Sequence, residues 1–185
     1  MDNITKEQIE FKINDIDRLF LEYELIFKKV ESNIPDLFDM TILGSVLHSF
    51  YNGLENIFEI IAKNIDKDMP TGNKSHQELL HQMASENANR REVINEKIYL
   101  SLREYATFRH FYRHAYSFQL NWEKMKPLVK SLMNVWSEVK LSLKNFININ
   151  NAWTSIKQRE ISFVWYFFMQ TRGRTFCRQG DEPFV

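Results

Sequence analysis

The stretch NITKEQIEFKINDIDRLFLEYELIFKKVES, residues 3–32, carries the clearest apolar period in the 185-residue chain. Its apolar side chains recur at alternating steps of four and three: Ile9, Ile13, Ile16, Phe20, Tyr23, Phe27 and Val30. This spacing puts one apolar stripe along a helix, as in helices that pack together along their length. The stretch therefore predicts a single long helix over 3–32, which Pro35 ends because proline disfavours helical geometry in the residue before it.

Three more long segments and one short segment show the same helical period. The predicted long helices cover 36–65, a stretch from about 95 into 109–116, and 122–148. We expect these stripes to be buried: Leu43, Leu47, Phe50, Leu54, Ile57 or Phe58, Ile61 and Ile65; Ile98, Leu102, Tyr105 and Phe108; Leu128, Leu132, Val135, Val139, Leu143 and Phe146. Ser75 and Glu78 have the spacing of a capping box for a short helix at about 76–87, and 86–92 reads as a polar connector. The sequence thus predicts an all-α fold, an antiparallel four-helix bundle with a short extra helix.

The composition favours helices and sets limits on partners. Five glycines and four prolines among 44% hydrophobic residues argue against a sandwich or a barrel. Lys plus Arg and Asp plus Glu balance at 24 each, so a polyanionic partner would need a local basic patch. The single cysteine, Cys177, excludes an intrachain disulfide framework. No apolar run approaches a membrane span and the N-terminus lacks a secretory pattern, so we expect a cytoplasmic protein with no membrane partner.

We expect residues 1–148 to form the helical domain and residues 149–185 to form a tail of different character. The tail region contains the asparagine-rich ININNAW, the apolar ISFVWYFF and the basic RGRTFCRQGDEPFV. An appended arm, a dimer contact and a segment not native to the domain all fit this pattern.

The stretch RHFYRHAY, residues 109–116, gathers residue types that act on phosphates. His110 and His114 stand four apart, a spacing that on a helix suits one metal ion. No carboxylate or cysteine nearby completes such a site, and Arg109 and Arg113 would repel a cation. We therefore expect no metal and no cofactor here.

The same residues suit RNA cleavage without a metal ion. That reaction needs a base for the 2′-hydroxyl proton, an acid for the leaving 5′-oxygen and a cation for the phosphorane. Histidine titrates near neutral pH and can serve as base or acid, whereas arginine stays charged and its fork fits phosphate oxygens. One His114 does not easily fill both proton-transfer roles. Two chains that each supply one would do so, which predicts a homodimer.

Arg109, four intervening residues, His114, one residue and Tyr116 spell R-x4-H-x-Y. This resembles the signature of HEPN-domain ribonucleases, in particular of the HepT-type toxins of bacterial toxin–antitoxin pairs. The resemblance covers roughly residues 5–148, where the order of two long helices, an insertion and two more helices is also similar. It implies a HEPN-like bundle and a metal-independent endoribonuclease. Its composite site would lie between two protomers, with Arg109 and His114 as catalytic residues.

The resemblance also implies roles for residues around this pair. Tyr116 is similar to the tyrosine that, in HepT systems, the partner minimal nucleotidyltransferase (MNT) antitoxin modifies with AMP. A bulky anionic adduct beside His114 would block phosphate entry by charge and volume. His110 and Arg113 are expected to support binding of the RNA substrate. Glu55, in the second predicted helix, is interpreted as a solvated carboxylate, with pairing to these cations as the alternative.

Two other functions fit the same pattern. In the first, the chain is a non-catalytic helical binding subunit of a nucleotidyltransferase, and the arginines and histidines hold a nucleotide or a partner surface. In the second, it is a helical interaction module in which RHFYRHAY is a solvated helix end. Growth arrest on expression of the chain alone is expected for a toxin and not for a passive subunit.

Overall fold

The computed structural model describes residues 1–72 and 74–172, with side chains in 1–72 and 74–149. The described residues form these helices and helical turns, in chain order: α1 (Asn3–Glu22), α2 (Glu24–Ser32), α3 (Leu37–Ile61), a π-helical turn η1 (Ala62–Asp66), α4 (Ser75–Met83), α5 (Glu96–Tyr112), a 3-10 turn η2 (Ser117–Gln119) and α6 (Trp122–Arg172). No β-strand occurs in the described part of the chain, so the predicted all-α class is confirmed.

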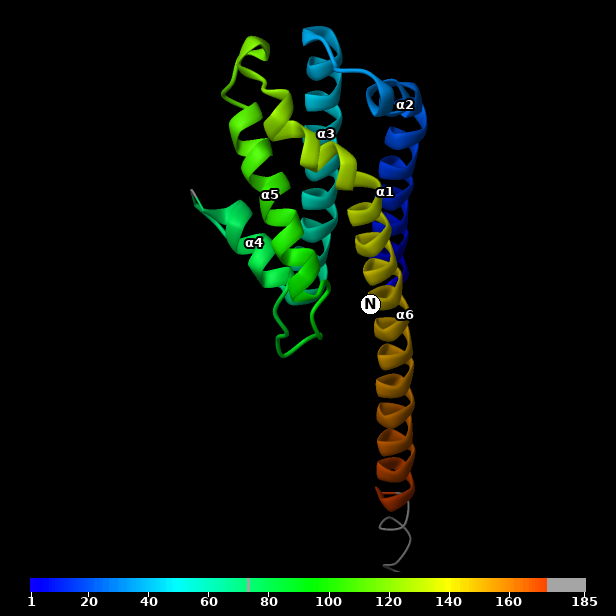
Figure 1. Cartoon of the computed structure of the whole chain (residues 1–185). Coiled ribbons are helices and arrows are strands. Elements are labelled where there is room, and N and C mark those ends of the chain that lie inside the picture. The colour runs from blue at the N-terminus through cyan, green and yellow to red at the C-terminus, as the bar shows by residue number, and fades with distance from the viewer. Residues whose placement is uncertain (73, 173–185) are drawn as a thin grey trace, which may run out of the picture. The chain divides into compact units, whose positions relative to one another are not determined.

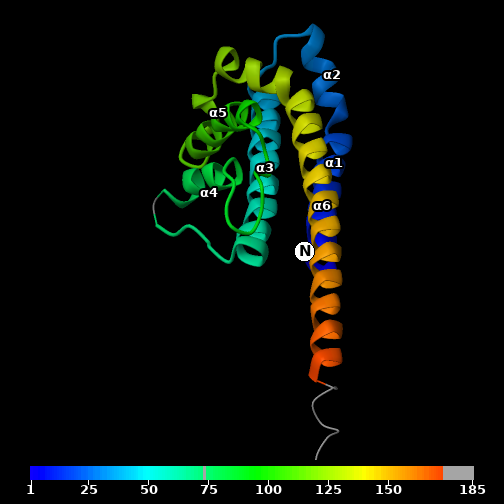
Figure 2. The same cartoon turned by 90° about the horizontal axis from the view of Figure 1, so that it is seen from below.

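Helices α1, α3, α5 and the part of α6 up to residue 147 run in alternating directions (Figures 1 and 2). The core lies between them. Phe50 of α3 packs against Phe20 of α1, Tyr105 of α5 and Trp136 of α6, with ring centroids 5.7, 5.4 and 6.2 Å apart. The antiparallel four-helix bundle, with α4 as the short extra helix, is therefore as predicted.

The predicted apolar stripes are largely confirmed, with two shifts on α6, where Val129 is buried in place of the partly buried Leu128. Leu132, Val139 and Leu143 are buried as expected. Trp136 is buried in place of the partly buried Val135, and its indole Nε1–H donates to Asp17 Oδ1 of α1 at 2.8 Å. The sequence pattern missed this residue because a large ring with a bonded polar tip fills more of the core than a valine one position earlier.

The first helix is not continuous, contrary to the prediction for 3–32. Tyr23 leaves helical geometry at φ −105° and ψ 14°, and separates α1 from α2. The stripe continues only in part: no residue of α2 is buried, but Phe27 and Val30 are half-buried and pack against the core. In addition, α2 is tied to the start of α3 by Lys29 Nζ, 2.6 Å from Asp39 Oδ1. No proline or glycine marks this break, so the sequence carried no signal for it.

The predicted capping box of the short helix is also wrong. Ser75 is already the first residue of α4, the N-cap is Lys74, and no side chain caps the helix. The backbone carbonyl of Lys74 accepts the N–H groups of Gln77 and Glu78. The helix ends at Met83 rather than near 87.

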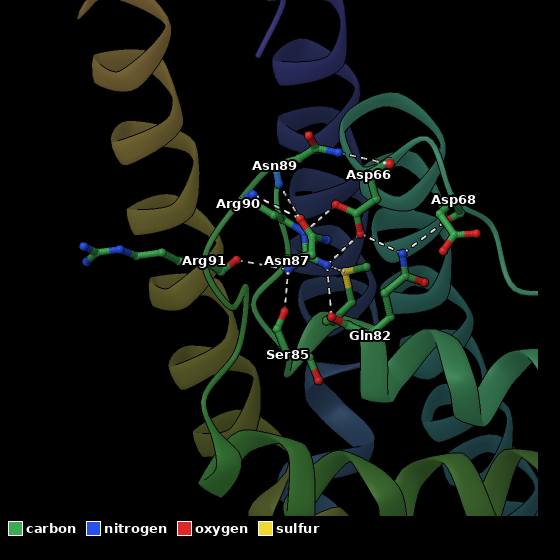
Figure 3. Close-up of polar contacts among 9 residues, drawn as sticks. Asp66, Asp68, Gln82, Ser85, Asn87, Asn89, Arg90 and Arg91 are labelled. Atoms are coloured by element: carbon green, nitrogen blue, oxygen red, sulfur yellow. Dashed lines mark hydrogen bonds and ion pairs between the residues drawn. The ribbon is translucent and has the colours of Figure 1, made fainter.

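The segment 86–92, expected to be a polar connector, contributes Arg90 to a buried ion pair with Asp66 (Figure 3). Arg90 Nε and Nη2 lie 2.7 Å from Asp66 Oδ1 and Oδ2, and the two side chains are 0% and 2% exposed. The backbone carbonyls of Gln82 and Ser85 accept further guanidinium hydrogen bonds at 3.0 Å. The pair joins the end of η1, which continues α3, to the chain after α4 and so fixes α4 against the bundle.

The chain divides into two units between residues 147 and 148. Helix α6 was expected to end near 148 but continues to Arg172. The role of the predicted 149–185 tail stays a prediction, since its side chains from 150 onward, Cys177 included, lie outside those described. None of the described helices is long and apolar enough to cross a membrane.

Candidate functional site

The R-x4-H-x-Y residues lie across the C-terminal end of α5 rather than inside the helix. Asn95 caps the helix start by accepting the Ile98 N–H, and the helix ends at Tyr112. Arg109 is therefore in the last turn, His114 is in the turn that follows, and Tyr116 comes just before η2. The end of the helix gives the three side chains different surroundings.

Arg109 is held by two side chains of α3. Its Nη2 lies 2.7 Å from Glu55 Oε2, and its Nε–H donates to Asn52 Oδ1 at 2.8 Å. The guanidinium-bearing side chain is only 13% exposed and the Glu55 side chain 6%. The interpretation of Glu55 as a solvated carboxylate is therefore wrong, and the alternative of pairing with a cation of this stretch is correct. Asn52 was missed, although it lies three positions before Glu55 on the same helix.

The contact from Asn52 continues to His48, one turn earlier on α3. Asn52 Nδ2 lies 2.9 Å from His48 Nε2. An amide nitrogen can only donate, so Nε2 accepts and the ring proton of neutral His48 is on Nδ1. Burial and the charges of Arg109 and Arg113 lower the pKa of His48, which favours this neutral form.

Glu55 carries an unusual carboxyl group. Burial raises its pKa to about 7, although the Arg109 guanidinium acts in the opposite direction. Its second oxygen, Oε1, lies 3.0 Å from Nδ1 of His76 on α4, but without the geometry of a hydrogen bond. Burial and the same arginine lower the pKa of His76. His76, which the sequence did not single out as functional, thus closes a polar chain across α3, α4 and α5.

A pocket of about 490 Å³ opens beside this chain of contacts. Its lining comes from α3, α4 and α5: Tyr51, Glu55, His76, Gln77, Leu80, Tyr99, Arg103, Ala106, Thr107, Arg109 and His110. The volume lies within the range of about 300–1,000 Å³ that small-molecule sites occupy. The buried arginine of the motif is therefore part of a pocket wall.

The remaining predicted site residues are exposed. The His114 ring packs edge-on against His110, with centroids 5.3 Å apart, and its backbone N–H donates to Phe111 O. Arg113 is exposed at the end of α5. Within the described residues of one chain, Arg109 and His114 make no hydrogen bond, ion pair or ring contact with each other. The structure brings Arg109 and His110 to the pocket and leaves His114 and Arg113 on the adjoining surface.

Tyr116 is the most exposed tyrosine of this region. Its side chain is 69% exposed, and its ring stacks on Phe118 at 5.3 Å with an interplanar angle of 6°. Its backbone N–H donates to Gln119 Oε1 at 2.9 Å, which fixes the turn. Among the residues with described side chains, no group of three or more His, Cys, Asp or Glu converges as metal ligands would.

Comparison with known proteins identifies one family. The family described as HepT-like protein matches residues 42–150, more than half of the 185 residues. The match includes α3 from residue 42 on, all of α4 and α5, and the polar chain between them. Searches of curated proteins and of solved structures find no match.

Proposed function

The chain belongs to the HepT-like family, and from this premise we propose that it is a metal-independent RNA endonuclease, the toxin of a toxin–antitoxin pair. The proposed active site is composite: two protomers pair so that the Arg109 and His114 of each face one RNA strand. His110 and Arg113 add positive charge for the RNA backbone.

The observation that carries this proposal is the way Arg109 is held. Glu55 and Asn52 engage Nη2 and Nε from one side, and Nη1 has no hydrogen-bond partner among the described residues. A guanidinium fixed before the substrate arrives stabilises developing phosphate charge without reorganising. An arginine at a merely solvated helix end would have no such buried partners.

In the proposed reaction, His114 of one protomer takes the 2′-hydroxyl proton as the 2′-oxygen bonds to phosphorus. The bond from phosphorus to the 5′-oxygen breaks, and the partner's His114 gives its proton to that oxygen. Arg109 contacts the phosphorane oxygens. The products are a 2′,3′-cyclic phosphate and a 5′-hydroxyl.

The proposed control is AMP transfer to Tyr116 by an MNT-type antitoxin. The 69% exposed side chain is accessible to a modifying enzyme. Only Ala115 separates it from His114 on the chain, so an added phosphate places negative charge beside the reacting groups. Tyr116→Phe keeps the stack on Phe118 and removes the acceptor oxygen, so the variant should stay active when the antitoxin and ATP are present. Inhibition of Tyr116→Phe equal to that of the wild type would refute this control.

The test of the proposed function uses end-labelled RNA incubated with the purified full chain in EDTA. We expect cleavage with cyclic phosphate ends. Arg109→Ala and His114→Ala should each lose about 10²–10⁴-fold in rate. Arg18→Ala, which removes an exposed arginine of α1 that pairs with Glu22, is the matched control and should cut at the wild-type rate.

Three results would contradict the proposal. Cleavage that requires a divalent ion is the first, and a His114→Ala variant that cuts at the wild-type rate is the second. The third is unimpaired growth of cells that express the chain alone, which would favour a non-catalytic nucleotidyltransferase subunit.

A further inference from the structure

The pocket between α3, α4 and α5 has at its floor a buried polar group that makes no hydrogen bond to the described residues. Tyr51 is 1% exposed and lines the pocket, and its hydroxyl has no hydrogen-bond partner among the described residues. A buried hydroxyl without a hydrogen-bond partner lowers the unfolding free energy by about 1–3 kcal/mol. Because burial raises the pKa of Tyr51, the hydroxyl keeps its proton and is a ready donor.

An acceptor lies one turn further along α3. Glu55 is 4% exposed, and Arg109 pairs with its Oε2, whereas its Oε1 lies 3.0 Å from His76 Nδ1 and makes no hydrogen bond. The pocket floor therefore offers one donor and one acceptor side by side on a single helix face. Every nucleobase presents a complementary acceptor and N–H donor next to each other on its Watson–Crick edge.

The walls and mouth of the pocket fit the other parts of a nucleotide. Leu80 and Ala106 supply apolar surface, and the Tyr99 ring forms part of the wall, with Arg103 Cζ 5.9 Å from its centroid. Arg103 and His110 are exposed around the opening, where an anion can reach them. An apolar slot with a polar floor and a cationic rim suits a flat base that carries a phosphate.

We propose that this pocket is a binding subsite for one unpaired nucleotide, whose base edge bonds to Tyr51 and Glu55 and whose phosphate meets Arg103 and His110. The inference rests on the proposed function in taking RNA, held next to Arg109, as the source of the nucleotide. A free nucleotide has the same chemistry, and the experiment separates the two sources.

The first measurement is calorimetric binding of nucleoside 5′-monophosphates and of ribose 5-phosphate to the full chain. Nucleotides should bind at least tenfold more tightly than the base-free sugar phosphate. Tyr51→Phe should weaken nucleotide binding about tenfold, the effect of one hydrogen bond, and leave ribose 5-phosphate binding unchanged. The same variant should melt at a higher temperature than the wild type, because it loses an unpartnered hydroxyl.

Tyr105→Phe is the matched control, since Tyr105 is another buried tyrosine but donates to Leu128 O at 2.8 Å and lies outside the pocket. It should lower the melting temperature and leave nucleotide binding unchanged. Ala106→Leu adds an apolar side chain to the pocket wall and removes no polar group, and it should also weaken binding. Wild-type nucleotide affinity in Tyr51→Phe, or equal affinity for ribose 5-phosphate and nucleotides, would overturn the proposal.

The second measurement identifies the source. RNA substrates with one abasic residue, placed in turn at each position around the cut, are compared for cleavage rate. A single position at which the loss of the base slows cleavage at least tenfold assigns the pocket to RNA, whereas nucleotide binding with no such position assigns it to a free nucleotide. Nucleotide binding without RNA cleavage would refute the proposed nuclease activity and support the nucleotide subsite. RNA cleavage without nucleotide binding would support the nuclease activity and refute the subsite.

Discussion

Arg109 of α5 and Glu55 of α3 form an ion pair, with Nη2 2.7 Å from Oε2, in which neither side chain is more than 13% exposed. The pair joins the two helices beside the pocket and leaves one carboxylate oxygen without a hydrogen bond. Burying a carboxylate costs free energy even beside an arginine, so the pair makes the site sensitive to pH.

The first prediction concerns folding stability as a function of pH. The pKa of Glu55 rises from an ordinary 4.5 to about 7 on folding. Between these values the folded state keeps a proton that the unfolded state has lost, so this carboxyl makes the protein less stable as the pH rises from about 4.5 to 7. Glu55→Gln has no such proton. Relative to this variant, the wild type should lose about 3 kcal/mol of unfolding free energy between pH 4 and pH 8.

Urea unfolding of both proteins across that range measures the difference. Glu22→Gln, a change of an exposed carboxylate that pairs with Arg18 at 3.4 Å, is the control and should follow the wild type. A constant difference between the wild type and Glu55→Gln at all pH values would show that folding leaves the pKa of Glu55 unchanged.

The second prediction concerns Asn52 as a positioning residue. Its Oδ1 accepts the Nε–H of Arg109 and so fixes the plane of the guanidinium. Asn52→Ala should slow RNA cleavage about tenfold in the wild-type background. In the Arg109→Ala background it should have no further effect, because nothing is left to position. A double-mutant cycle of cleavage rates gives the coupling, and equal losses in both backgrounds would show that Asn52 acts on the fold alone.

Much of the fold follows from sequence periodicity, because a bundle of long amphipathic helices uses the most readable pattern in proteins. The stripe of α5 and most of α3 are buried as predicted. The break at Tyr23 was not predictable in this way, since the apolar period continues through it and only tertiary contacts of α2 decide the bend.

The sequence predicted the motif residues of the candidate site, but it did not predict the side chains of α3 that hold Arg109. Arg109, His114 and Tyr116 follow from the resemblance of R-x4-H-x-Y to the signature of HEPN-domain ribonucleases. Glu55 and Asn52 lie at the edge of the α3 stripe, and a polar residue there is solvated in most helices. Only the packing of α5 over this edge turns them into partners of the arginine, and no local pattern encodes that packing.

The third prediction concerns the buried pair of Arg90 and Asp66. Removing the arginine leaves a carboxylate that is 2% exposed without its cation. Arg90→Ala should therefore lower the unfolding free energy by about 3–5 kcal/mol in urea. Lys97→Ala, which breaks an exposed pair with Glu138 at 2.6 Å, is the control and should change it by less than about 1 kcal/mol. Similar losses in the two variants would contradict the structural role of Arg90.

The fourth prediction concerns the close approach of Gly44 of α3 to Tyr112 at the end of α5. A β-carbon on Gly44 would lie 2.7 Å from Cε2 of Tyr112, so the ring must move. That ring also stacks on Phe108 at 5.8 Å and packs on His48 at 5.2 Å. Gly44→Ala should thus destabilise the protein by about 1–3 kcal/mol, despite the better helix propensity of alanine.

Changing Tyr112 to alanine reverses the sign of this effect. Without the ring, only the helix propensity remains, so Gly44→Ala should stabilise the Tyr112→Ala protein by up to about 1 kcal/mol. Unfolding of the two single variants and the double variant in urea measures the change. A stabilising Gly44→Ala in the wild-type background would mean that the two helices do not approach this closely. In that case the end of α5, and with it the position of Arg109, would be less tightly fixed against α3.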